Sequence, residues 1–528
     1  MRDLVFLGLT LLLGMALLAT LAQRLRIPTP IFLVMGGLLT SLIPGVPTLT
    51  IEPDLIFLVF LPPLLYEAAW FMSWRELWRW RRIVLVLAFG LVVLTATAVA
   101  YASTALIPGF TLALGFLLGG IISPPDAVAA TSVLKGVNVP KSTLSILEGE
   151  SLINDASSLV VFRFAMATVI SGTFVWQEVG LNFVMVTVMG AVIGLAVAGV
   201  FYAIHRWLSI QPRITILLTF IAPYIMYLTA EQFHYSGVIA VVSGGLFLSN
   251  HSSRLLNHTE RVQGLAMWAT VIFIINGLVF VLIGLELSVV VKELDGHSLA
   301  DAIGYGLAIS ALVIVVRLVF AQFAMVFTEI VGRFIPVAVR NVGWRGPVVL
   351  GWAGMRGVVS LAAALSIPLT LPSGGPFPER SLILFITFVV ILVTLVLQGL
   401  TLPLVIRWVH PKELIPRLAE EKQEATINRQ LHEAALRELT QQYTIADNHL
   451  LVNLKNRLES GLLLNQYVSS DRDDPLLTDY NDALARLHRI KRQELERLRH
   501  QEEFDVDVIR KIEAQLDLEE EKSNHAIR

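Results

Sequence analysis

The chain has 528 residues, of which 55% are hydrophobic and only 16% are charged, and its formal net charge is −2. Soluble domains carry about a quarter charged residues, so this composition predicts an integral membrane protein. A net charge near zero gives no indication of nucleic-acid binding. The absence of cysteine excludes disulfides, thiolate metal sites and cysteine nucleophiles. Residues 4–22 are followed by Gln-Arg-Leu-Arg and not by a small-residue cleavage site, so we expect a retained span and not a cleaved signal.

Apolar runs of about 20 residues, the length that crosses a bilayer, predict thirteen membrane spans. They lie at roughly 4–22, 30–46, 54–72, 83–106, 111–134, 145–171, 180–204, 213–231, 236–249, 265–290, 300–328, 347–369 and 381–408. Arginine and lysine gather in alternate loops, whereas the intervening loops hold only Lys292 and Arg380. By the positive-inside rule, we expect a plasma-membrane protein with its N-terminus outside and its C-terminal tail in the cytoplasm.

Two of these spans are interrupted, the fifth by Ser123–Asp126 (SPPD) and the twelfth by Gly354–Gly357 (GMRG). If the seventh span is a linker, residues 4–171 and 213–408 form two six-helix halves, and each break falls on the fifth member. An odd linker also forces the second half to be inverted. Interrupted helices at matching positions of inverted halves are typical of the midplane site of a transporter.

The tail, residues 411–528, differs sharply from the transmembrane domain at 1–410, because it is charged and carries leucines at helical spacing. This pattern predicts several amphipathic cytoplasmic helices. The tail is either a solvated appendage or a regulatory or dimerising domain, and the pattern does not separate the two.

A polar stripe runs along the sixth span. Its members fall within roughly 160° of one helix face and are Glu150, Ser151, Asn154, Asp155, Ser157 and Ser158. A carboxylate inside a bilayer costs at least ~2.5–3.5 kcal/mol, so it is rarely there without a function. The stripe therefore indicates part of an ion or proton path.

Charges within spans need partners or water. Arg356 lies at the second break, and Asp126 at the facing break is its natural partner for a salt bridge. Asp126 can alternatively bind an ion or cap the helix behind it, and we favour a structural role. Arg317 in the eleventh span also needs an acid, for which Glu150 is the best candidate. Snorkelling is the alternative for both arginines, but their mid-span placement argues against it.

These pairings leave Glu67 and Asp155 without a cationic partner. Burial disfavours the charge of an unpaired carboxylate, which a proton or a metal cation can neutralise in turn. That competition is the physical basis of cation/proton exchange. Ser151, one turn before Asp155, can supply a ligand oxygen, and oxygen ligands suit a hard alkali cation. Asn154 offers its amide to the same site or hydrogen-bonds to another helix.

Four motifs together resemble the monovalent cation–proton antiporter-1 family, the sodium–proton antiporters that include the NhaP type and the animal sodium–proton exchangers. They are Leu61–Glu67 (LPPLLYE), Ser123–Val128 (SPPDAV), Glu150–Asp155 (ESLIND) and Gly354–Gly357 (GMRG), and the resemblance covers about 1–410. It implies an all-α homodimer of thirteen-helix protomers, with two six-helix inverted repeats, crossed broken helices at spans 5 and 12, and elevator-like alternating access.

The resemblance also implies roles for single residues. Asp155 binds cation and proton in turn, Ser151 and Glu67 help to coordinate the cation, and Asn154 stabilises the site. It implies ion pairs of Glu150 with Arg317 and of Asp126 with Arg356, the same pairs that the cost of placing a charge in a bilayer suggests. Pro125 stands where many relatives have threonine, so only its backbone carbonyl can contribute a ligand there. Members with Asn-Asp at this motif typically exchange one cation for one proton without net charge movement.

The sequence therefore predicts a secondary antiporter that exchanges Na⁺, Li⁺ or K⁺ for H⁺ and serves pH and sodium homeostasis, with no cofactor and no enzymatic activity. A cation channel is the runner-up, but no filter such as TVGYG is present. A membrane sensor that signals through its tail would show no cation-dependent proton flux. An intramembrane hydrolase would need a motif such as HExxH, which is absent. Arg163 and Glu286 receive no role.

Overall fold

The computed structural model describes residues 2–25, 27–41, 53–134, 139–172, 176–208, 211–292, 298–331, 343–372, 374–414, 420–442, 449–470 and 475–499, with a few isolated residues between and after these ranges. Within these ranges all regular structure is helical, apart from one isolated bridge between Thr370 and Pro376. The predicted all-α class is therefore confirmed. The chain divides into two units, Met1–Ile415 and Pro416–Arg528.

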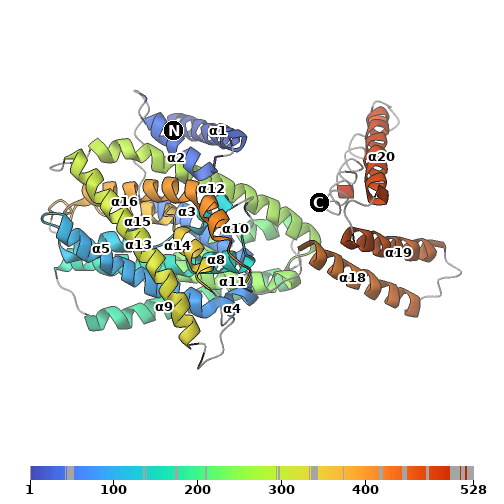
Figure 1. Ribbon diagram of the computed structural model, residues 1–528, viewed down its shortest axis with the longest axis horizontal. Coiled ribbons are helices and arrows are strands. Elements are labelled where there is room, and N and C mark those ends of the chain that lie inside the picture. The colour runs from blue at the N-terminus through green and yellow to red at the C-terminus, as the bar shows by residue number, and fades with distance from the viewer. Residues whose placement is uncertain are drawn as a thin grey trace. The chain divides into compact units, whose positions relative to one another are not determined.

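The first unit is a bundle of helices (Figure 1). In chain order these are α1 (Arg2–Leu25), α2 (Thr29–Ser41), α3 (Pro53–Phe71), α4 (Trp74–Leu85), the π-helix η1 (Val86–Leu91), α5 (Val92–Leu106), α6 (Leu112–Ile122), α7 (Ala127–Leu134), α8 (Lys141–Ser171), α9 (Trp176–Trp207), α10 (Pro212–Gln232), α11 (Gly237–Leu255), α12 (His258–Lys292), α13 (Leu299–Val331), α14 (Arg345–Trp352), α15 (Val358–Leu365), α16 (Arg380–Val393), the π-helix η2 (Thr394–Gln398) and α17 (Gly399–Val409). The second unit holds α18 (Glu420–Gln442), α19 (His449–Ser470) and α20 (Pro475–Arg499), of which α18 and α19 pack together.

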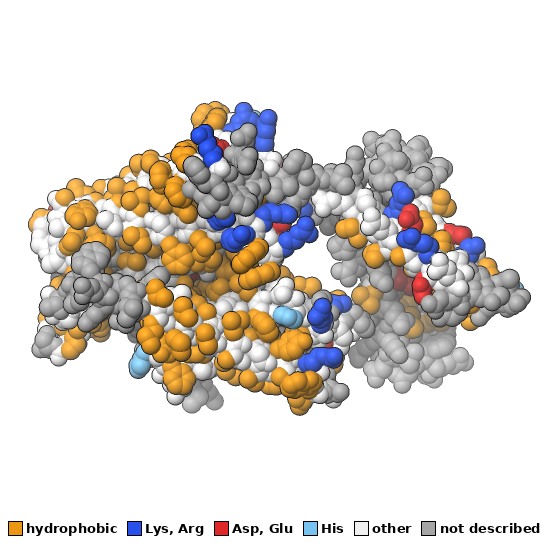
Figure 2. Space-filling view, turned by 90° about the horizontal axis from the view of Figure 1, so that it is seen from below, with side chains coloured by type: hydrophobic (Ala, Val, Ile, Leu, Met, Phe, Trp, Pro, Cys, Tyr) orange, Lys and Arg blue, Asp and Glu red, His pale blue; other side chains and the backbone are white. Residues whose placement is uncertain are grey.

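Nine helical segments among the described residues are long and apolar enough to cross a membrane. They are α1, α4–α5, α6–α7, α8, α9, α10, α12, α13 and α16–α17. The other four predicted spans coincide with α2, α3, α11 and the pair α14–α15, so the count of thirteen stays a prediction. Hydrophobic side chains cover much of the surface of the first unit in Figure 2. On α1, Leu9, Leu13 and Leu17 are 61–63% exposed at a spacing of four residues, as expected for a helix that faces lipid.

The fourth predicted span begins earlier than expected, at Trp74 and not at residue 83. The Ser73 hydroxyl accepts a hydrogen bond from the Glu76 N–H and caps the helix start. Because α4 is amphipathic, a search for apolar runs misses it. The helix then passes through η1, whose Ala88 carbonyl accepts a 2.5 Å hydrogen bond from the Ser157 hydroxyl of α8. A polar residue of the predicted stripe thus gives a backbone carbonyl of the π-helix a hydrogen-bond partner.

Candidate cation site

The two predicted helix breaks lie in direct contact. The first separates α6 from α7 at Ser123–Asp126, and the second separates α14 from α15 at residues 353–357. The Asp126 N–H donates a 2.7 Å hydrogen bond to the Met355 carbonyl, which joins one break to the other. Each break leaves helix-end groups unpaired by its own helix, and these groups face one another at a single place in the bundle.

Arg356 binds the end of α6, and no acid of the described ranges forms an ion pair with it. It is fully buried, its Nε donates a 2.9 Å hydrogen bond to the Ile122 carbonyl, and its terminal nitrogens donate to the Ser123 and Gly354 carbonyls. Its backbone N–H donates to Thr394 Oγ1 at 3.1 Å, at the start of η2. A guanidinium placed against helix C-terminal carbonyls is stabilised by their partial negative charge.

Asp126 caps the helix that follows it. Its Oδ1 accepts hydrogen bonds from the N–H groups of Val128 (2.8 Å) and Ala129 (3.3 Å), at the start of α7. A side chain at Gly357 would overlap its other oxygen, so the close approach of the breaks requires glycine there. The predicted salt bridge between Asp126 and Arg356 is therefore wrong, because each residue satisfies backbone groups at a helix end instead. The favoured structural role of Asp126 agrees with this cap.

The second expected pair, Glu150 with Arg317, is present in the structure. Arg317 of α13 donates two hydrogen bonds, of 2.5 and 2.9 Å, to the two oxygens of Glu150 on α8, and both residues are 1% exposed. Arg163 also has a partner, which sequence reasoning did not find. It donates bonds of 2.7 and 2.9 Å to both oxygens of Glu231, at the end of α10.

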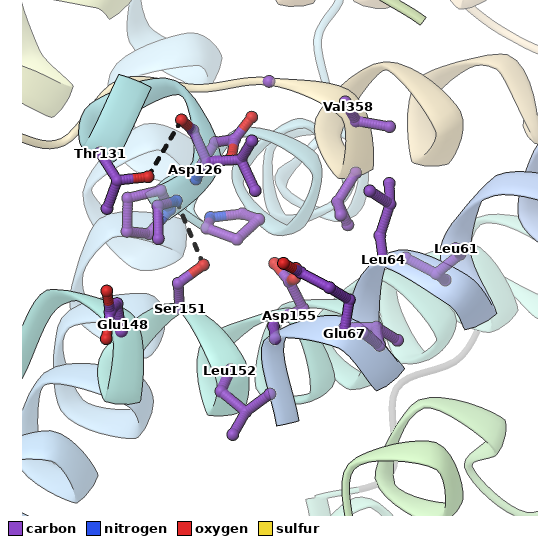
Figure 3. A pocket seen from close by; sticks show the side chains of 18 of the residues that line it. Leu61, Leu64, Glu67, Asp126, Thr131, Glu148, Ser151, Leu152, Asp155 and Val358 are labelled. Carbon is purple, nitrogen blue, oxygen red and sulfur yellow. Dashed lines mark hydrogen bonds between the residues drawn. The ribbon is translucent and has the colours of Figure 1, made fainter. Parts of the chain in front are cut away.

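A cavity of about 230 Å³ lies beside the breaks (Figure 3). The predicted ligand residues Glu67, Ser151, Asp155 and Pro125 all line it, and so does Asp126. Figure 3 shows the Glu67 and Asp155 carboxylates, from α3 and α8, pointing toward one another. The Ser151 hydroxyl accepts a 3.2 Å hydrogen bond from the Ala127 N–H, so one of its lone pairs already serves the start of α7.

Two predicted or considered residues lie outside the cavity wall. Asn154 is fully buried next to Asp155, and neither atom of its amide group forms a hydrogen bond in the structure. Glu286 of α12 is half-buried and is not among the lining residues.

Sequence reasoning missed four polar residues of the wall, Thr131, Glu148, Asn276 and Ser360. Glu148 precedes Asp155 by seven residues and therefore shares its helix face, a spacing that could have identified it. Asn276 and Ser360 are single polar residues within apolar spans and carry no comparable signal.

The cavity has the chemistry of an alkali-cation site. Carboxylate, hydroxyl and carbonyl oxygens are the ligands that hard cations prefer. Within the described ranges no lysine or arginine forms an ion pair with Asp155. An ionised carboxylate without a partner is costly at this depth, so binding of a proton or a cation is favoured. One site can therefore hold either species.

A family model described as "Sodium/hydrogen exchanger, transmembrane" matches residues 9–408. The chain belongs to the sodium/hydrogen exchanger family. It is 33% identical over 508 residues to an uncharacterized Na(+)/H(+) exchanger of Mycobacterium bovis, covering 95% of this chain and 92% of that protein. It is 34% identical over 414 residues to a sodium, potassium, lithium and rubidium/H(+) antiporter of Bacillus pumilus, covering 76% of this chain and 61% of that one. A low-affinity Na(+)/H(+) antiporter of Synechocystis, NhaS1, is 32% identical over 397 residues, which cover 74% of this chain and 72% of the relative.

The fold of this exchanger matches the sodium proton antiporter MjNhaP1 from Methanocaldococcus jannaschii, with a TM-score of 0.61 and 19% identity over 78% of this chain and 99% of that one. The family resemblance read from the four motifs is confirmed. This exchanger is a multi-pass helical membrane protein of a family that exchanges cations for protons.

Proposed function

We propose that this exchanger moves one Na⁺, or a related alkali cation, against one H⁺, and that the two compete for Asp155. The observation that carries this proposal is the pair of carboxylates, Glu67 and Asp155, that converge in a cavity beside two touching helix breaks. Ser151 and the Pro125 backbone carbonyl complete the proposed ligand set, and Asn154 stabilises the site. The names of the Bacillus and Synechocystis relatives support Na⁺ as substrate and leave Li⁺ and K⁺ open.

A second cavity, of about 370 Å³, supports alternating access. Leu58 and Leu159 line it, one helical turn from Leu61 and Asp155, which line the first cavity. Leu61 packs in an apolar cluster with Leu58, Leu159 and Ala156. An apolar layer between the proposed cation site and the second cavity is what a transporter open to one side requires, and this cluster supports it.

The position of Glu148 indicates toward which side of the membrane the first cavity opens. This residue lines the first cavity on the Lys141 side of Asp155 and is exposed. In the predicted orientation that end of α8 is cytoplasmic, and this exposure supports an inward-facing state. The finer architecture belongs to the same proposal: thirteen spans in two inverted repeats, crossed breaks, elevator motion, a homodimer in the plasma membrane and a cytoplasmic tail with a regulatory or dimerising role.

Everted membrane vesicles test the proposal. An imposed pH gradient, acid inside, should collapse on addition of Na⁺ or Li⁺ with wild-type protein, and Asp155→Asn should abolish the response. Asp301→Asn is the matched control, because Asp301 is an exposed residue in the first turn of α13. Wild-type activity of Asp155→Asn would refute the proposed site.

The stoichiometry needs a separate assay. In proteoliposomes with valinomycin and K⁺, a one-for-one exchange should be insensitive to an imposed membrane potential. Turnover driven by the potential would exclude electroneutral exchange. A cation flux without proton counterflow would indicate the channel alternative.

A further inference from the structure

Helix α4 presents an aromatic and basic face that the cation site does not use. Trp74 and Trp78 are 46% and 57% exposed, and their rings stack with centroids 5.8 Å apart. Arg81 lies on the same face, and its guanidinium carbon is 4.6 Å from the centroid of the Trp78 ring. The opposite face is buried and apolar and consists of Leu77, Trp80, Ile83 and Val84.

The exposed face is positively charged. Residues 74–85 contain four arginines and one acid, Glu76. That acid is already engaged, because it accepts hydrogen bonds from Arg79 at 2.9 Å and from Trp80 Nε1 at 3.3 Å. Arg75 is exposed and forms no ion pair within the described part of the chain. Among the described residues neither Arg75 nor Arg81 forms an ion pair, so no acid described there neutralises their charge beside the two tryptophans.

The length of the helix places this face at the membrane surface. The continuous helix Trp74–Leu106 has 33 residues, about 50 Å at 1.5 Å per residue, whereas the hydrocarbon core is about 30 Å thick. The apolar residues 86–106 fill the core, so α4 projects into the headgroup layer. Tryptophan is enriched at that depth, and basic residues there attract anionic lipids.

We propose that the exposed face of α4, formed by Trp74, Arg75, Trp78 and Arg81, binds the headgroup of an anionic phospholipid. Guanidinium groups bind a phosphodiester through paired, charge-assisted hydrogen bonds, and the stacked indoles pack along the glycerol and upper acyl chain. The interaction is electrostatic at its core, so it weakens as ionic strength rises.

A lipid bound to α4 can influence the cation site through the packing of α4 against α8. A side chain at Gly149 of α8 would lie 3.1–3.2 Å from the side chains of Val84 and Leu77, so these α4 side chains pack directly against the α8 backbone at this residue. Gly149 immediately precedes Glu150, which holds Arg317. A lipid that fixes α4 therefore steadies the part of α8 that carries the buried ion pair.

The test measures thermal stabilisation of the purified full-length protein by added lipid, in a neutral detergent. Phosphatidylglycerol should raise the Tm of the wild type, and phosphatidylcholine should raise it much less. Each arginine near an anionic surface contributes about a fivefold change in affinity, so Arg75→Gln with Arg81→Gln should shift the midpoint of the phosphatidylglycerol titration by about 25-fold. Arg437→Gln with Arg457→Gln is the matched control and should titrate like the wild type, because it removes two exposed arginines of α18 and α19 in the second unit, outside the apolar spans.

Two results would overturn the proposal. One is an unchanged phosphatidylglycerol titration in the double variant, which would place the lipid elsewhere. The other is equal stabilisation by glycerol 3-phosphate, which would make the ligand a soluble phosphate and not a lipid. If the double variant loses too much stability, Trp74→Leu with Trp78→Leu supplies the same comparison without removing charge. Because the readout is stability, its outcome is independent of whether Asp155 carries transport.

Discussion

The buried ion pair between Glu150 and Arg317 supports a quantitative prediction. Both side chains are no more than 2% exposed, and two hydrogen bonds of 2.5 and 2.9 Å join them. Arg317→Met keeps an unbranched side chain but leaves a carboxylate alone in an apolar site. Removing one partner of a buried pair costs about 3–5 kcal/mol, because the remaining charge is uncompensated.

This loss converts to a measurable shift in Tm. An unfolding entropy of about 2.1 cal/mol/K per residue gives about 0.9 kcal/mol/K for a unit that ends at Ile415. The Tm of Arg317→Met should therefore fall by about 3–6 °C, as followed by tryptophan fluorescence of the purified protein. Arg163→Met is the control, because the side chains of its pair with Glu231 are 45% and 28% exposed. Such pairs contribute about 0–1 kcal/mol, so its Tm should change by about 1 °C or less.

A double variant completes the test. Glu150→Gln combined with Arg317→Met removes both charges, and its Tm should recover toward the wild type. The reasoning would be refuted if Arg317→Met were as stable as Arg163→Met. It would also be refuted if the double variant were less stable than Arg317→Met alone.

Two further predictions concern the contact between the breaks. Gly357→Ala places a Cβ against Asp126, and overpacking of about 1–3 kcal/mol should slow exchange by about tenfold, whereas Gly346→Ala, where a Cβ meets open space, should leave the vesicle assay unchanged. Equal rates for the two variants would contradict the tight contact. Arg356→Ala strips the Ile122 carbonyl of its partner and should reduce the yield of folded protein more than the apparent cation affinity. Normal yield with a large change in affinity would make Arg356 a transport residue.

The sequence singled out two carboxylates that the fold brings to one cavity, and it predicted the contacts of the charged residues around them only in part. Bilayer cost singled out Glu67 and Asp155, and both line the same cavity. The same argument paired Glu150 with Arg317 correctly but failed for Arg356. It counted only charged side chains, whereas a helix break also offers carbonyl groups that can satisfy a buried guanidinium.

Other features depend on tertiary placement that a single sequence does not contain. Arg163 and Glu231 lie in different predicted halves, and only the fold shows that α8 and the end of α10 meet. The early start of the fourth span at Trp74 was missed, because a search for apolar runs does not detect an amphipathic helix. Neither π-helix was predicted, because a π-turn has no distinct periodicity in so few residues.

The central claim is that Asp155 holds a proton and a cation in turn, and proton release on cation binding measures this most directly. Na⁺ is added to purified protein in weakly buffered detergent solution, and the released protons are counted with a pH indicator. The wild type and Asp301→Asn should release about one proton for each Na⁺ bound, because the cation displaces it from the carboxylate. Asp155→Asn should release none. Release from Asp155→Asn equal to that of the wild type would contradict the claim.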